Sequence, residues 1–409
     1  MSKKQIIGLF GIYGLYNYGC EAIVRGTYEL IKQAWPDCDI ILYTFFATDD
    51  KEIIGDLEIK IKKAPVKNNQ IIRRIINKVL RIFSIRTQLS IWDAKSVADE
   101  CDVIFSVGGD IYTIPKHLLD SNKEPKHNLI VEFGKGVLKR KPLIIWGASI
   151  GPFGNNKKVN RYYFDHLKEV TQIFCREEKT LNYLVGNGIT NNIQLYSDPA
   201  FYIKSTHSKE LYLKGKKIRI ALNLSPLSIR EQIGENYDSF KDEIIITIIE
   251  LLSIPNTEIV LVPHVISPLS EKDNDLAYLG EIYKKIPNEY KNSVILLGNM
   301  KGFLGTKEFL KTCDVAIAAR MHCAVNAICE SIPTIFLTYS QKGLGMSHFI
   351  YGNYKWAIPI LDIKKELKNK TLEMLREKEN ISKIIKKKIE EILSEESKIV
   401  NSLKKITKS

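Results

Sequence analysis

The sequence lacks the features that define several specialised classes of protein. No apolar run reaches the roughly 18–20 residues that a helix needs to cross a bilayer. The seven cysteines are scattered and include no CxxC pair, which argues against a disulfide framework or a zinc site and is typical of reduced thiols in the cytoplasm. No nucleic-acid-binding signature accompanies the net charge of +13, so we expect no nucleic-acid partner.

The positive charge instead indicates an anionic partner, either a phosphate-rich substrate or a membrane surface. With 44% hydrophobic and 26% charged residues, the composition is that of a globular protein, and 409 residues suffice for two or three domains. The N-terminus has the basic start and apolar run of a signal peptide. However, Asn17 and Tyr18 stand where lipoprotein processing before Cys20 requires small and aliphatic residues, so we expect a first core strand.

Short β-rich runs alternate with helical patterns, which indicates parallel sheets covered by helices. The expected strands are QIIGLFG, DIILYTF, DVIFSVGG, PLIIWGAS, QIFCRE and IQLYSD, then IRIALNLSP, EIVLVPHV, SVILLG, DVAIAA and TIFLTY. We predict an α/β protein of two Rossmann-like domains that face a cleft, over residues 1–204 and 218–362. A basic, solvated helical tail is expected over residues 363–409.

Glycine-rich turns follow three of the expected strands. In GIYGLYNYGCEAI the glycines would let a ligand approach the backbone, and a helix starts near Asn17 and Glu21. Glu21 could bind a hydroxyl or complement the helix dipole. Asp110 in SVGGDIY could accept hydrogen bonds from sugar hydroxyls or cap a turn, and Ser149 in WGASIGPFG could line the cleft.

Two further strands end in cationic side chains. Arg176, in FCREE, offers a planar fork for carboxylate or phosphate, or forms a salt bridge with Glu177, Glu178 or Asp198. His264 follows EIVLVP directly and is either a site residue or a satisfied loop histidine.

The largest group of candidate anion-binding residues follows the strand DVAIAA. Arg320 and His322 flank Met321, and the next helix points its N-terminal amides at the same place. Lys342, after TIFLTY, can add a further positive charge. We therefore expect this group to bind an anion.

A basic segment from Lys60 to Arg86 contains no acidic residue. It predicts an amphipathic helix with Ile72, Ile75, Ile76, Val79 and Phe83 on one face and Arg73, Arg74, Asn77, Lys78 and Arg81 on the other. Such a helix lies on a membrane surface or packs its isoleucine face on the sheet. The second alternative is favoured, because most amphipathic helices of globular folds face a core.

Eight motifs occur in the order GLYNYGCEAI, VGGD, GASIGPF, CREEKTLNYL, SDPAF, VPH, ARMHCAVNAICESIPTI and YSQKG. Together they resemble the polysaccharide pyruvyltransferase family, over most of the chain from Ile6 to Lys342. The resemblance implies a fold like that of GT-B glycosyltransferases. It also implies transfer of a pyruvyl group from phosphoenolpyruvate (PEP) to two hydroxyls of a sugar as a cyclic ketal.

The family's arginine-x-histidine motif matches Arg320 and His322, which implies PEP binding by both, and Arg176 looks like its other PEP-binding arginine. Two positions depart from the family pattern. Cys20 stands where an aspartate is common, and Asp110 where a third glycine is common, which leaves the acceptor sugar open.

The resemblance therefore implies an enzyme of capsule, exopolysaccharide or cell-wall polymer assembly, in the cytoplasm or at the inner face of the membrane. Its donor would be PEP, its acceptor a nucleotide- or lipid-linked sugar, and it would need no cofactor or metal. The domain over residues 218–362 would bind PEP, and the domain over 1–204 would bind the acceptor, with contacts from Asn17, Glu21, Asp110 and Ser149. His322 is the candidate acid/base or phosphate-binding residue, and His264, Glu21 or Asp110 would activate the sugar hydroxyl. The alternatives are a GT-B glycosyltransferase that uses a nucleotide sugar and a non-catalytic sugar-binding protein.

Overall fold

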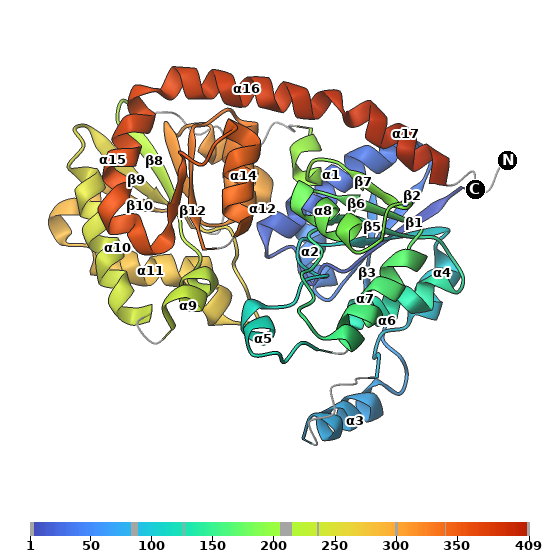
Figure 1. Ribbon diagram of the computed structural model, residues 1–409. Helices are drawn as coiled ribbons and strands as arrows, with labels where there is room; N and C mark the ends of the chain where they lie inside the picture. Colours follow the sequence, from blue (N-terminus) through green and yellow to red (C-terminus); the bar gives the residue numbers. More distant parts are fainter. Residues whose placement is uncertain are drawn as a thin grey trace. The chain divides into compact units, whose positions relative to one another are not determined.

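The computed structural model describes residues 4–406 except 83–88, 126, 205–214, 235–236, 299–301 and 340. The chain divides into two compact units (Figure 1). The first comprises the described residues up to Leu15, from Ile23 to Pro199 and from Glu395 onward. The second comprises Tyr16–Ala22 and Ala200–Ser394.

The first unit contains a seven-stranded parallel sheet in the order β3-β2-β1-β4-β5-β6-β7, a Rossmann strand order extended by one strand. The strands are β1 (Ile6–Phe10), β2 (Asp39–Thr44), β3 (Ile59–Lys63), β4 (Val103–Val107), β5 (Leu143–Ala148), β6 (Gln172–Cys175) and β7 (Ile193–Leu195). Its helices are α1 (Tyr18–Ala34), whose first residues belong to the second unit, α2 (Ala47–Ile53), α3 (Gln70–Ile82), α4 (Ala94–Glu100), α5 (Lys116–Asp120), α6 (Leu129–Leu138), α7 (Lys157–Glu169), α8 (Glu178–Gly186) and α17 (Glu396–Ile406).

The second unit repeats this topology with a six-stranded parallel sheet in the order β10-β9-β8-β11-β12-β13. The strands are β8 (Ile218–Asn223), β9 (Thr257–Leu261), β10 (Val294–Leu296), β11 (Val315–Ala318), β12 (Thr334–Thr338) and β13 (Ala357–Pro359). Its helices are α9 (Pro226–Ile233), α10 (Tyr237–Leu252), α11 (Asp275–Lys285), α12 (Gly302–Leu310), α13 (Met321–Cys329), α14 (Gln341–Tyr351), α15 (Ile363–Arg376) and α16 (Lys378–Ser394). The strand order changes direction between β8 and β11, which is where ligands bind in such sheets.

The predicted fold class is confirmed: both units are parallel α/β sheets, and every strand expected from the sequence is present. Two strands were missed. The edge strand β3 alternates isoleucine with lysine, so its pattern disappeared within the lysine-rich segment. The other, β13, is three residues long and ends in a proline.

The units differ from the expected domains in three places. Residues 200–204, expected in the first domain, belong to the second unit. The segment Tyr16–Ala22, which includes the first five residues of α1, belongs to the second unit although it follows the first strand of the chain. The segment over residues 363–409 is helical, but it is divided: α15 and α16 belong to the second unit and α17 to the first.

The expected solvation of this segment is wrong. Leu367 on α15, Ile385 on α16 and Leu403 on α17 are buried, because each helix turns an apolar stripe inward. Helix α15 packs against α10 and β13. Only the opposite faces carry the lysines and glutamates that made the segment look solvated.

Helix α3 contradicts the favoured prediction for the basic segment. Its isoleucines face outward, with Ile71 69% and Ile75 58% exposed. The sheet of the first unit therefore does not bury this apolar face. None of the helices in the described ranges is both long and apolar enough to span a membrane.

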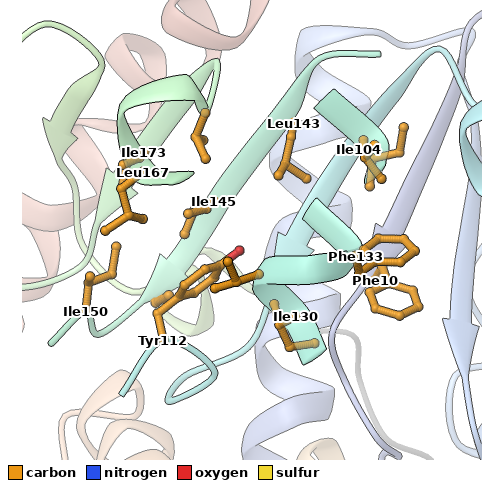
Figure 2. Packing of buried hydrophobic residues seen from close by; sticks show 14 of the residues in the cluster. Phe10, Ile104, Tyr112, Ile130, Phe133, Leu143, Ile145, Ile150, Leu167 and Ile173 are labelled. Atoms are coloured by element: carbon orange, nitrogen blue, oxygen red, sulfur yellow. The ribbon is translucent and has the colours of Figure 1, made fainter. Parts of the chain in front are cut away.

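The core of the first unit is aromatic where α6 crosses the sheet. The rings of Phe10 and Phe133 stack with centroids 3.7 Å apart (Figure 2). His166 on α7 belongs to the same buried layer, with its ring parallel to that of Tyr112 at 6.1 Å. Burial, reinforced by the charge of Lys135, lowers the pKa of His166 to about 3.

This buried imidazole should make the first unit acid-sensitive. As pH falls below 6.5, His166 becomes protonated in the unfolded chain but stays neutral in the folded chain. The free energy of unfolding therefore falls by about 1.4 kcal/mol per pH unit until the folded pKa near 3 is reached. Between pH 7.5 and 5, the wild type should lose about 2 kcal/mol more stability than His166→Gln, as measured by urea unfolding. Equal losses in both proteins would show that His166 titrates normally.

Candidate functional site

Arg320 lies at the switch in strand order of the second sheet. Its backbone is extended and forms the N-cap of α13, directly after β11. The Arg320 amide donates to the Asn223 side-chain oxygen at 2.9 Å, and the Ala319 amide donates to the Asn223 carbonyl at 3.1 Å. Asn223, the last residue of β8, therefore holds the backbone of Arg320 in place at the end of the neighbouring strand β11.

Two carboxylates hold the guanidinium of Arg320. Nη2 lies 2.7 Å from Asp275 Oδ1 and 2.6 Å from Asp273 Oδ1, and Nε lies 3.3 Å from Asp275 Oδ1. Burial opposes the positive charge, but Asp275 and Asp273 outweigh it, and the pKa of Arg320 is raised. The guanidinium is thus permanently charged and fixed in direction.

The Asp275 carboxylate connects this arginine to the loop after β9. It is fully buried at the start of α11. Its Oδ2 accepts the backbone N–H groups of His264 and Val265, each at 3.0 Å. Asp273 and Asp275 were missed, although both lie in the polar segment SEKDND a few residues after His264. Only the three-dimensional pairing distinguishes them from surface acids.

His264 is buried between Tyr18 and Phe303, with ring centroids 5.5 and 5.9 Å away. Burial, and then the nearby His322 and Arg320, lower its pKa well below the ordinary value. Among the described residues, none hydrogen-bonds to its Nε2. His264 is therefore neutral at physiological pH, and its Nε2 is available to a hydrogen-bond partner.

The first glycine-rich motif contributes to this same site. In the segment Tyr16–Ala22, the Tyr18 amide donates to the His264 carbonyl at 3.1 Å, and Asn17 pairs with Val265 in an antiparallel bridge. A Cβ on Gly19 would lie 2.5 Å from His322 Nδ1. Only glycine therefore allows the first residues of α1 to lie so close to His322.

Asn17 and Glu21, both predicted to bind the acceptor, use their side chains within the fold. Asn17 Oδ1 accepts the Gly19 amide at 3.0 Å. Glu21 is fully buried, and its Oε2 accepts the Phe303 amide at the start of α12 at 2.5 Å. Gly302 has a φ of +70°, and a Cβ there would collide with this carboxylate. Glu21 thus caps the N-terminus of α12 and has a structural role in the second unit.

In the first unit, the residues predicted at the ends of β4, β5 and β6 form a second group. Arg176 donates to Asp198 Oδ2 at 2.9 Å, to Ser149 Oγ at 3.0 Å and to Asp110 Oδ1 at 3.4 Å. Burial opposes its charge, but Asp198 and Asp110 raise its pKa. The salt bridge with Asp198, one of the sequence-based alternatives, is therefore present, and Asp110 and Ser149 lie beside it.

The predicted site residues thus form two groups, each within one unit. Asn17, Glu21, His264, Arg320 and His322 gather in the second, and Asp110, Ser149 and Arg176 in the first. The side chain of Lys342 lies outside the described residues.

Comparison of folds gives the class of protein. The structure is similar to the UDP-GlcNAc 2-epimerase from Neisseria meningitidis bound to UDP-GlcNAc, with a TM-score of 0.59 and 12% identity over 98% of this chain and 100% of that one. It is also similar to a UDP-glucosyltransferase from Polygonum tinctorium, with a TM-score of 0.58 and 9% identity over the whole of both chains. A third similar structure is Anabaena HepE in complex with UDP and glucose, with a TM-score of 0.56 and 12% identity over 98% and 99%. The fold is therefore that of the GT-B glycosyltransferases and related epimerases.

The family is given by a match to the sequence, over a range that contains the residues of both groups. The model of the polysaccharide pyruvyl transferase family matches residues 17–341, and this chain belongs to that family. No curated protein matches the chain in sequence. The resemblance stated from the motifs is thus confirmed at the level of the family.

The Asp275–Arg320 pair should dominate the stability of the second unit. In Asp275→Asn, the charge is lost and the new NH2 group can face the backbone N–H donors of His264 and Val265, with which it cannot hydrogen-bond. We therefore expect the free energy of unfolding to fall by about 3 kcal/mol. Asp273→Asn is the matched control: its side chain is 32% exposed, and the loss should stay below about 1 kcal/mol. Pulsed hydrogen exchange along a urea series measures the unfolding of this unit from its own peptides. Similar losses in the two variants would argue against Asp275 as the connecting group.

Proposed function

We propose that this protein transfers a pyruvyl group from PEP to two hydroxyls of a sugar, forming a ketal during assembly of a capsule, exopolysaccharide or cell-wall polymer. The observation that carries the proposal is the grouping of a fixed Arg320 and His322, just after β11, with a neutral His264, just after β9, in a member of the pyruvyl transferase family. The acceptor would be a nucleotide- or lipid-linked sugar, and the reaction would take place in the cytoplasm.

PEP would bind by exchange of one carboxylate for another. Asp275 is fully buried and keeps Arg320 in place, whereas Asp273 is partly exposed. The PEP carboxylate or phosphate would displace Asp273 from Nη2, and the N-terminal amides of α13 would add hydrogen bonds. Lys342 would contribute further charge, as the sequence indicates.

The proposed chemistry needs one acid and one base. A proton is added to the methylene carbon of PEP, and the first sugar hydroxyl attacks the cation at C2 and loses its proton. Phosphate then leaves with its bonding electron pair, and the second hydroxyl closes the ring. The two hydroxyl protons end on the new methyl group and on the released phosphate. The neutral His264 would take the first hydroxyl proton, and His322 would supply the proton to carbon or hold the phosphate.

The group in the first unit would act on the acceptor. Asp110 is 63% exposed and could accept sugar hydroxyls, while Arg176 keeps Asp110 and Ser149 together. The family resemblance also implies that Arg176 binds PEP. Arg176→Lys distinguishes the roles: a raised KM for the sugar alone supports positioning, and a raised KM for PEP supports donor binding.

A GT-B glycosyltransferase is the second candidate, because similar folds are solved with UDP or a UDP-sugar. Thermal stabilisation by PEP and not by UDP-sugars favours the proposed function, and the reverse favours the glycosyltransferase. A non-catalytic sugar-binding protein would release no phosphate from PEP.

The proposed function is tested with PEP and candidate acceptors. Wild type should release phosphate and add about 70 Da to the sugar, the mass of a pyruvyl ketal. Arg320→Lys and His322→Ala should each lower kcat/KM for PEP about 100-fold or more. Asp273→Asn should lower the Kd for PEP several-fold, because a competing carboxylate is removed. Phosphate release near the wild-type rate in both Arg320→Lys and His322→Ala would refute the site assignment.

The close approach of the first motif to His322 gives an independent test. Gly19→Ala forces the imidazole to move, so kcat should fall at least about tenfold while the fold is retained. Gly186→Ala on α8 is the matched control, because its Cβ would meet no atom within 4 Å. Circular dichroism and phosphate release together separate loss of folding from loss of geometry. An active Gly19→Ala protein would show that the position of His322 is not critical.

A further inference from the structure

Helix α3 presents an apolar face to the outside of the first unit. Six apolar side chains share one side of the helix and are well exposed: Ile71 (69%), Ile72 (60%), Ile75 (58%), Ile76 (38%), Val79 (43%) and Ile82 (71%). Helical geometry at 100° per residue places them within one arc. Figure 1 shows α3 apart from the helices that cover the sheet.

The polar face of α3 attaches the helix to its own unit. Asn77 is buried; its side chain donates to the Leu89 carbonyl at 3.0 Å and accepts the Leu89 amide at 2.7 Å. Arg73 donates to the Ser90 carbonyl at 3.2 Å. These bonds fix the rotation of the helix, so the isoleucines point away from the unit. The arrangement is the reverse of an ordinary surface helix, whose apolar face is buried.

Charge distinguishes the partners that could cover this face. Between Ile59 and Trp92 the chain contains nine Lys and Arg residues and no acidic residue. Arg74 and Lys78 are exposed on α3 and lie next to the apolar arc. A second copy of the chain would bring the same positive charges together. An interfacial helix with an apolar face and basic flanks is complementary to a membrane of anionic lipids.

We propose that α3 docks the protein on the surface of an anionic lipid bilayer, with its isoleucines among the acyl chains and Arg74 and Lys78 at the headgroups. The helix lies in the plane of the interface and does not cross the membrane. This inference is independent of pyruvyl transfer. If the proposed function also holds, docking brings the enzyme to lipid-linked acceptors.

Vesicle flotation with the full-length protein tests the docking. Wild type should bind vesicles of phosphatidylcholine with phosphatidylglycerol at low salt and bind pure phosphatidylcholine much more weakly. The double variant Ile71→Ser/Ile75→Ser should lower the affinity about tenfold or more, because these side chains supply the apolar contact. Arg74→Gln/Lys78→Gln should lower it about 25-fold on anionic vesicles only, since each of the two basic residues contributes about fivefold.

The matched control is Ile384→Ser/Leu393→Ser on α16, another lysine-rich amphipathic helix, where the side chains are 41% and 42% exposed. It should bind vesicles as wild type does, and circular dichroism should show that all variants are folded. The proposal is overturned if wild type does not float with anionic vesicles at low salt, or if Ile71→Ser/Ile75→Ser floats equally well. A dimer in solution that dissociates in Ile71→Ser/Ile75→Ser would assign the face to a second copy instead.

Discussion

The buried carboxylate of Asp275 is the constraint on which the second unit's site depends. A charge inside a protein must be neutralised and hydrogen-bonded, and Asp275 obtains both from the guanidinium of Arg320 and the amides of His264 and Val265. One side chain thereby fixes the loop after β9 against the junction of β11 and α13. The positions of two candidate site residues, Arg320 and His264, follow from that single requirement.

The two units use the same arrangement around their key arginines. Arg320 is held by a fully buried carboxylate, Asp275, and a partly exposed one, Asp273. Arg176 is held by Asp198, whose side chain is 1% exposed, and by Asp110, whose side chain is 63% exposed. In each case a buried acid and an exposed acid share the same arginine. Under the proposed function, an anion would replace the exposed Asp273 at Arg320 while Asp275 keeps the guanidinium in place.

Several features of the site were predictable because they are local. Strand ends, the glycines after them and the Arg320–His322 pair can be recognised in short stretches of sequence. The carboxylates were not, because Asp275 looks like any acid in a polar loop until the fold brings Arg320 to it. The structural role of Glu21 was not predictable for the same reason, because its helix-capping bond to Phe303 joins residues 282 positions apart.

The sequence by itself determined the two parallel sheets, the family and the residues at the strand ends, because alternating apolar runs and short motifs act over a few neighbouring positions. Only the tertiary structure decided which charges neutralise each other, which unit contains the segment Tyr16–Ala22 and which face of α3 is exposed to solvent. The amphipathic pattern of α3 is the same whether its isoleucines point inward or outward. The choice depends on hydrogen bonds from Asn77 and Arg73 to a returning segment of the chain, and such non-local contacts leave no periodic signal in the sequence.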